Sequence, residues 1–87
     1  MKAVITVIGK DMVGILAKVS TACAEANANV AEVTQSVLDE YFAMIMLVEI
    51  DKMNCTLDEL KNRIDQVVPT MRVHVMHEDI FNSMHRI

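Results

Sequence analysis

The feature that most constrains this chain is a run of ten residues, from Tyr41 to Ile50, in which Glu49 is the only charged side chain. A second apolar run, Ala3 to Ile8, is mostly β-branched and ends at the turn signal Gly9-Lys10-Asp11. Apolar runs without alternation are typical of strands that are buried on both faces. The sequence therefore predicts a sheet in which the strand at 41–50 is central and the strand at 3–8 is buried.

A helix is predicted over residues 13–27. Asp11 or Met12 precedes it, and aspartate is a competent N-cap. Asn27 can adopt the left-handed conformation that ends many helices. The apolar positions recur at helical spacing and predict one buried face, formed by Ile15, Leu16, Val19, Cys23 and Ala26.

A second helix is predicted after Thr56, because Thr56 and Glu59 have the spacing of a capping box. Pro69 ends this helix, since proline cannot continue it. Its apolar stripe consists of Leu57, Leu60, Ile64, Val67 and Val68.

Two further strands are predicted, at 30–38 and 71–78. Asp39-Glu40 is a tight-turn candidate that joins the first of them to the central strand as a hairpin. The strand at 30–38 alternates weakly, with Glu32, Thr34 and Ser36 on one face and Ala31, Val33 and Val37 on the other. The tail, residues 79–87, has apolar residues at the spacing of a short helix.

The predicted order of strand, helix, strand, strand, helix, strand is that of an α+β, ferredoxin-like βαββαβ fold. Right-handed crossovers place both helices on one face of a four-stranded antiparallel sheet. The other face is then apolar and open, which favours a homodimer. Alternatively, the apolar tail folds over that face within one chain.

Composition narrows the classes of function. The net charge of −4, with basic residues scattered singly, argues against direct nucleic-acid binding. Cys23 and Cys55 form no CxxC pair and are interpreted as structural thiols. The N-terminal apolar run is too short for a signal peptide and no stretch approaches a membrane span, so a cytoplasmic protein is expected.

Catalytic and metal motifs are missing from the sequence: it has no nucleophile elbow, phosphate loop or HExxH. His74 and His77 fall on opposite faces of a strand, and a site with His85 would need the tail to fold back. We therefore expect no enzyme activity, no metal site and no cofactor.

The segment from Gly9 to Leu16 resembles the opening motif of ACT domains: a strand ending in glycine, then Asp11, Gly14 and an aliphatic pair. The element order over residues 1–78 and the Asn29-Val30 start of the second strand strengthen the resemblance. The whole chain is similar to small stand-alone ACT proteins and to the domains of the glycine-cleavage repressor. The resemblance implies an ACT domain at 1–78, with 79–87 packing on it or on a partner subunit.

The resemblance also implies a non-catalytic regulatory domain that binds an amino acid or a related metabolite at a homodimer interface. The site would lie between the first loop of one subunit and the second strand of its partner. The corresponding positions in this sequence are Lys10, Asp11, Met12, Val13, Gly14, Asn29, Val30 and Ala31.

The physical reading agrees with that placement. A helix N-terminus suits a carboxylate, and Gly14 allows close approach to the backbone. Asp11, Asn29 or Glu32 could accept hydrogen bonds from an ammonium group. The same residues also have purely structural interpretations: a cap for Asp11, helix–sheet fit for Gly14, a turn for Asn29 and a solvated charge for Lys10. Two other classes of function stay open, a protein–protein interaction module without a small ligand and an enzyme.

Overall fold

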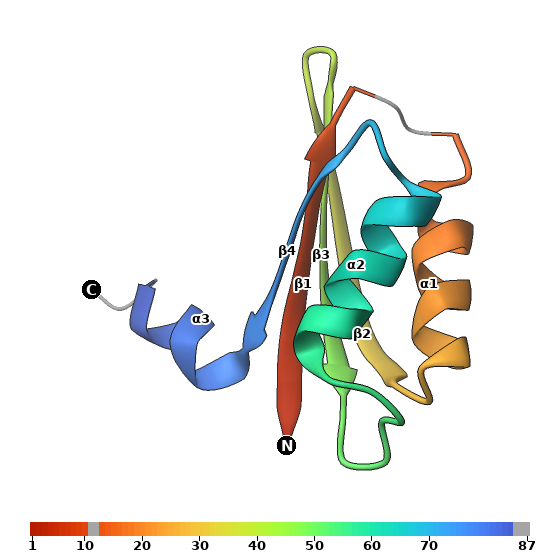
Figure 1. Ribbon diagram of the computed structural model, residues 1–87. Helices are drawn as coiled ribbons and strands as arrows, with labels where there is room; N and C mark the ends of the chain where they lie inside the picture. Colours follow the sequence, from red (N-terminus) through yellow and green to blue (C-terminus); the bar gives the residue numbers. More distant parts are fainter. Residues whose placement is uncertain (11–12, 85–87) are drawn as a thin grey trace.

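The computed structural model describes residues 1–10 and 13–84, and it has the predicted order of elements (Figure 1). None of the three described helices has the length and apolar character that a membrane crossing requires. The elements are β1 (Lys2–Gly9), α1 (Ile15–Glu25), β2 (Asn29–Leu38), β3 (Tyr41–Glu49), α2 (Leu57–Val67), β4 (Arg72–His77) and α3 (Glu78–Met84).

The four strands form one antiparallel sheet in the order β2-β3-β1-β4. The central position predicted for the strand at 41–50 is confirmed, because β3 pairs with both β1 and β2. Helices α1 and α2 cover one face of the sheet (Figure 1). Between these layers lies a mostly aliphatic and sulfur-rich core that also contains Phe42; its largest fully buried side chains are Ile5, Ile15, Met44, Met46, Leu60 and Ile64.

The local signals for α2 and for the hairpin are confirmed. The Glu59 N–H donates to Thr56 Oγ1 at 3.1 Å, and the Thr56 N–H donates to Glu59 Oε1 at 3.3 Å, which completes the capping box. Asn27 has φ 60° just after α1. Asp39 has φ 57° in the turn between β2 and β3, a conformation that short polar side chains tolerate.

The start of α1 differs from the prediction. The helix begins at Ile15, and Gly14 occupies the N-cap position with φ 72°. That left-handed conformation suits glycine and turns the chain sharply into the helix, so Val13 stays outside it. Asp11 and Met12, the expected caps, lie outside the described residues.

The face assignment at the start of β2 is also corrected. Val30 pairs with Val48, and Glu32 pairs with the next residue of β3, Leu47, so Ala31 is the extra residue of a β-bulge. Val30 therefore packs against the core with Val33, whereas Ala31 is exposed. The bulge shifts the alternation by one residue, and simple period-two reasoning cannot detect such a shift.

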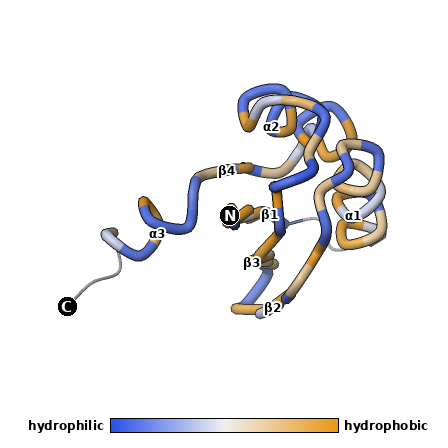
Figure 2. The backbone as a smooth tube through the Cα atoms, turned by 90° about the horizontal axis from the view of Figure 1, so that it is seen from below, coloured by the Kyte–Doolittle hydropathy of each residue, from blue (hydrophilic) through white to orange (hydrophobic). Residues whose placement is uncertain are grey.

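The second face of the sheet is only partly covered. Helix α3 lies on the side opposite α1 and α2 (Figure 2), where it packs against β1 and β4. Val4, which points to this side, is 3% exposed, while Ile8 and Ile45 remain 44% and 42% exposed. The chain's own tail thus covers this face around Val4 and leaves Ile8 of β1 and Ile45 of β3 exposed.

Candidate functional site

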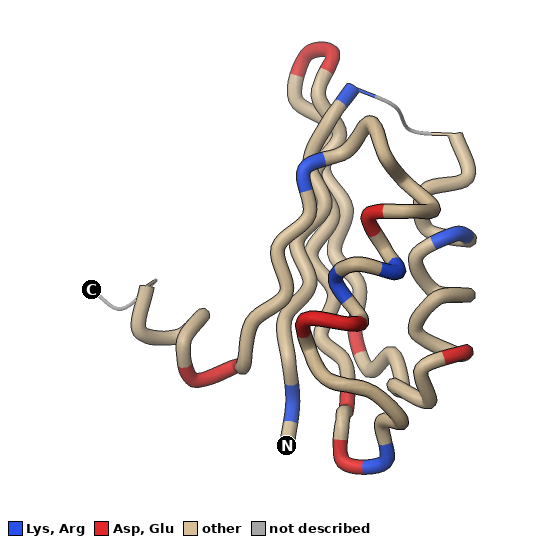
Figure 3. Tube along the Cα trace, viewed as in Figure 1, with Lys and Arg blue, Asp and Glu red and all other residues tan. Residues whose placement is uncertain are grey.

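The first loop leaves β1 beside the tip of the β2–β3 hairpin. Lys10 Nζ lies 3.2 Å from Glu40 Oε1 and 5.6 Å from the centroid of the Tyr41 ring. The opposite charges of the loop and the hairpin tip stand together at this end of the sheet (Figure 3). Both side chains of the ion pair are more than half exposed, so the pair contributes little to stability. Lys10 therefore lies against the hairpin tip, in an exposed ion pair with Glu40.

The start of α1 is chemically suited to an anion. The first N–H groups of a helix have no partner within the helix, and they carry a partial positive charge. Gly14 has no side chain with which to cap them, and the first turn of α1 contains no acidic residue. Gly14 and Val13 are both exposed, so this end of the helix is open to a ligand.

The second group of candidate residues lies where β2 begins. Asn29 Nδ2 donates to Glu49 Oε1 at 2.6 Å, which fixes the amide and directs its oxygen away from Glu49. Val30 is partly buried against the core, and Ala31 is the exposed bulge residue. Of these three, Asn29 offers side-chain polar atoms to a ligand.

Within one chain the two groups lie at opposite ends of the sheet. Gly9 pairs with Phe42, whereas Lys2 pairs with Glu49, which also pairs with Asn29. Seven steps of about 3.3 Å separate Lys2 from Gly9, a distance of about 23 Å. The structure therefore does not bring Gly14 and Asn29 together in a single copy.

A polar pocket of about 330 Å³ surrounds Asn29. Its other lining residues, Asn27, Glu49, Asp51 and Lys52, were not singled out from the sequence. Asn27 Nδ2 donates to the Lys52 carbonyl at 2.7 Å, which joins the end of α1 to the loop after β3. In the sequence these residues were marked by their polarity alone. Their closeness could not be predicted, because it arises from the pairing of β2 with β3.

The histidines and cysteines are placed as the sequence suggested. His74 pairs with Thr6 and His77 with Ala3, which puts them on opposite faces, and His85 lies outside the described residues. The described part of the chain contains no group of three or more histidine, cysteine or acidic residues that could hold a metal ion. Burial raises the pKa of the Cys23 thiol to about 11, which makes it unreactive at neutral pH.

A split βαβ sheet with an open helix start at the end of β1 defines a class, the small α+β regulatory domains. Comparison with known proteins makes the assignment specific, because residues 2–78 match the family model of the ACT domain. The chain belongs to the ACT domain family.

Relatives support this assignment over the full length. The chain is 43% identical to a UPF0237 protein of Listeria innocua, over the whole of both chains. A solved ACT domain protein from Streptococcus pneumoniae is 37% identical, with 98% of each chain covered and a TM-score of 0.78. A putative glycine cleavage system transcriptional repressor shares the fold at 16% identity, with 85% of this chain and 44% of that chain covered and a TM-score of 0.71.

Proposed function

We propose that this ACT domain is a non-catalytic regulatory module that binds an amino acid or a related metabolite between two copies of the chain. The observation that carries the proposal is the separation of the candidate site into two groups, which lie at opposite ends of the sheet in one chain. The open start of α1, with Lys10 and Gly14, supplies one half. Asn29 of a second copy supplies the other.

The chemistry of the two halves is complementary to an amino acid. The N-terminus of α1 favours the carboxylate, and Lys10 adds positive charge beside it. The Asn29 side-chain oxygen, with the Glu49 carboxylate in the same pocket, favours the ammonium group. Glu32, which the sequence also allowed in that role, pairs with Leu47 and points to the open face of the sheet, away from this pocket.

The exposed edge of the sheet supports a homodimer. Strand β2 is an edge strand, and its residues are exposed except for the partly buried Val30 and Val33. An edge of ten residues presents unpaired backbone groups to which a second chain can bind. Contact along β2 would place Asn29 of one copy next to the partner chain. In its own copy, Asn29 is separated from the start of α1, which lies at the other end of the sheet.

A catalytic role has little physical support. Among the described residues, the one side chain with a clearly shifted pKa is Cys23, and the shift makes its thiol less reactive. The groups near the start of α1 can bind and orient an anion, but no nucleophile with an adjacent base is found among the described residues there. Binding rather than turnover is the activity that these residues support.

The test is thermal unfolding of the purified protein against a panel of amino acids and related metabolites, with the mass in solution measured in parallel. A ligand that binds the folded state raises the melting temperature. We expect a shift with one compound on a protein of twice the chain mass. A monomer that responds to no compound would contradict the proposal.

The second candidate is a protein–protein interaction module. The exposed apolar residues near the hairpin, Val37, Leu38 and Tyr41, favour it, because they lie next to each other at one end of the sheet. A folded homodimer that responds to no metabolite, yet loses a partner when Leu38 is replaced by aspartate, would support this alternative over the first.

A further inference from the structure

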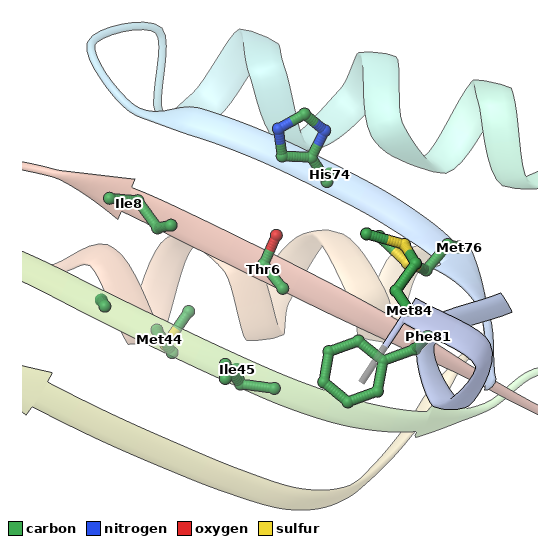
Figure 4. A pocket seen from close by; sticks show the side chains of 9 residues that line it. Thr6, Ile8, Met44, Ile45, His74, Met76, Phe81 and Met84 are labelled. Carbon is green, nitrogen blue, oxygen red and sulfur yellow. The ribbon is translucent and has the colours of Figure 1, made fainter. Parts of the chain in front are cut away.

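A pocket of about 340 Å³ lies on the face of the sheet opposite α1 and α2, between the sheet and α3. We call it the α3 pocket; Thr6, Ile8 and Ile45 form its floor, and Phe81 and Met84 form its α3 side (Figure 4). Helix α3 packs on β1 and β4, so the pocket stays open toward β3. The volume falls within the range of small-molecule sites.

The lining of the α3 pocket is apolar except at one point. Among the described residues that line it, only Thr6 and His74 have polar nitrogen or oxygen atoms in their side chains, and they are direct cross-strand neighbours on β1 and β4. In Figure 4 the Thr6 hydroxyl stands at the centre of the floor, between Ile8 and Phe81. Met84 of α3 and Met76 of β4 also line the pocket, and methionines adapt readily to the shape of an apolar guest.

Arg72 does not line the α3 pocket but is the cross-strand neighbour of Ile8, which does. Arg72 pairs with Ile8 and lies two residues from His74, on the same face of β4. No salt bridge of Arg72 is found within the described ranges, and its exposed side chain is long enough to reach over Ile8. None of the described residues that line the pocket is acidic. The pocket thus combines an apolar body with the hydrogen-bonding pair Thr6 and His74, and Arg72 stands beside its Ile8 end.

We propose that the α3 pocket is a second ligand site, which takes a monocarboxylic acid with an apolar chain or ring. The carboxylate lies at Arg72 and accepts hydrogen bonds from the Thr6 hydroxyl and the His74 ring, and the apolar part lies between Ile45 and Phe81. This site is on the opposite side of the sheet from the start of α1. It is independent of the proposed amino-acid site, and either can fail without the other.

The first experiment titrates octanoate into the full chain with ¹³C-labelled methionine methyl groups. Met76 and Met84 report on the α3 pocket, and Met53 and Met71, which pack with the helix-side core, serve as internal controls. We expect the first two methyl signals to move and the control signals to stay. Octan-1-ol, which has the same chain without the charge, should bind about tenfold more weakly. Equal binding of the two compounds would overturn carboxylate recognition, and unmoved Met76 and Met84 signals would overturn the site.

Variants separate the anion contact from the apolar contact. Arg72→Gln should weaken octanoate about tenfold and leave octan-1-ol unchanged, with Arg63→Gln on α2 as the matched control. Ile45→Trp should fill the pocket and abolish the binding of both compounds, and its 42% exposure makes it tolerant of change. If Ile45→Glu instead halves the mass in solution, the α3 pocket is an interface between copies, which would overturn this proposal. The amino-acid response of the wild-type protein would still stand as a separate result, because it tests the other proposed site.

Discussion

Met71 lies so close to the backbone of Gly9 that a Cβ atom on Gly9 would come within 2.5 Å of Met71 Sδ. Met71 is 7% exposed and fills the space where the chain enters β4 beside the end of β1. Gly9→Ala should therefore destabilise the fold by about 1 kcal/mol or less, because Met71 must shift but the clashing atoms are the end of a flexible side chain. Urea unfolding measures the change. The double variant Gly9→Ala/Met71→Ala should lose less stability than the sum of the losses of the two single variants. Strict additivity of the losses would show that the two residues do not compete for space.

Thr56 tests the capping box of α2. Thr56→Ala removes the acceptor of the Glu59 N–H, and we expect a loss of about 1 kcal/mol of stability. Thr56→Ser keeps a hydroxyl at the same position and should stay close to wild type. Both variants are compared by urea unfolding, and an equal loss in the two would mean that the Thr56 methyl group, rather than its oxygen, matters.

Cys23 makes the stability depend on pH in the alkaline range. Its thiol has a pKa of about 11 in the folded protein, against an ordinary value of 9.0, because burial disfavours the thiolate. Above pH 9 the unfolded chain loses this proton first, so stability is complete below pH 9 and falls as the pH rises toward 11. The loss attributable to Cys23 approaches roughly 2–3 kcal/mol.

The matched variant for this prediction is Cys23→Ala, which removes the titration. Its unfolding free energy is lower at neutral pH because a buried sulfur is lost, but its slope between pH 9 and 11 should be shallower than that of the wild type. Parallel slopes would contradict the assignment. A thiol reagent at neutral pH should label Cys55 and spare Cys23, which is buried.

Gly14 tests the location of the proposed amino-acid site. A β-branched residue at φ 72° is strained by roughly 1–2 kcal/mol, so Gly14→Val should rearrange the start of α1 and remove the ligand-induced rise in melting temperature. Gly14→Asn tolerates the left-handed conformation and should keep the fold closer to wild type. The space around Gly14 is open, so Gly14→Val itself should still fold. A folded Gly14→Val protein with a full response would place the site elsewhere.

The sequence predicted the order of the elements because the signals were local. The capping box of Thr56 and Glu59, the positive φ of Asn27 and the turn at Asp39-Glu40 each depend on neighbouring residues alone. The start of α1 was misplaced because a left-handed glycine, rather than a side-chain cap, sets it. The bulge at Ala31 was missed because it depends on the pairing with β3.

The candidate site was harder to predict than the fold. The residues themselves came from a family resemblance, while the distance between Gly14 and Asn29 depends on strand register. The partners of Asn29 in the polar pocket, Glu49 and Asp51, follow from the same register. The α3 pocket depends on how a seven-residue helix settles against a sheet, which no local pattern encodes.

The bulge at Ala31 also limits how this chain can polymerise. A regular ten-residue edge could add strand after strand from successive copies and grow into a fibre. At Ala31 the extra residue breaks the repeat of hydrogen-bonding groups and twists the edge. A neighbour that pairs along β2 therefore meets a break in the hydrogen-bonding repeat at Ala31. The irregular residue favours a closed assembly over an endless one.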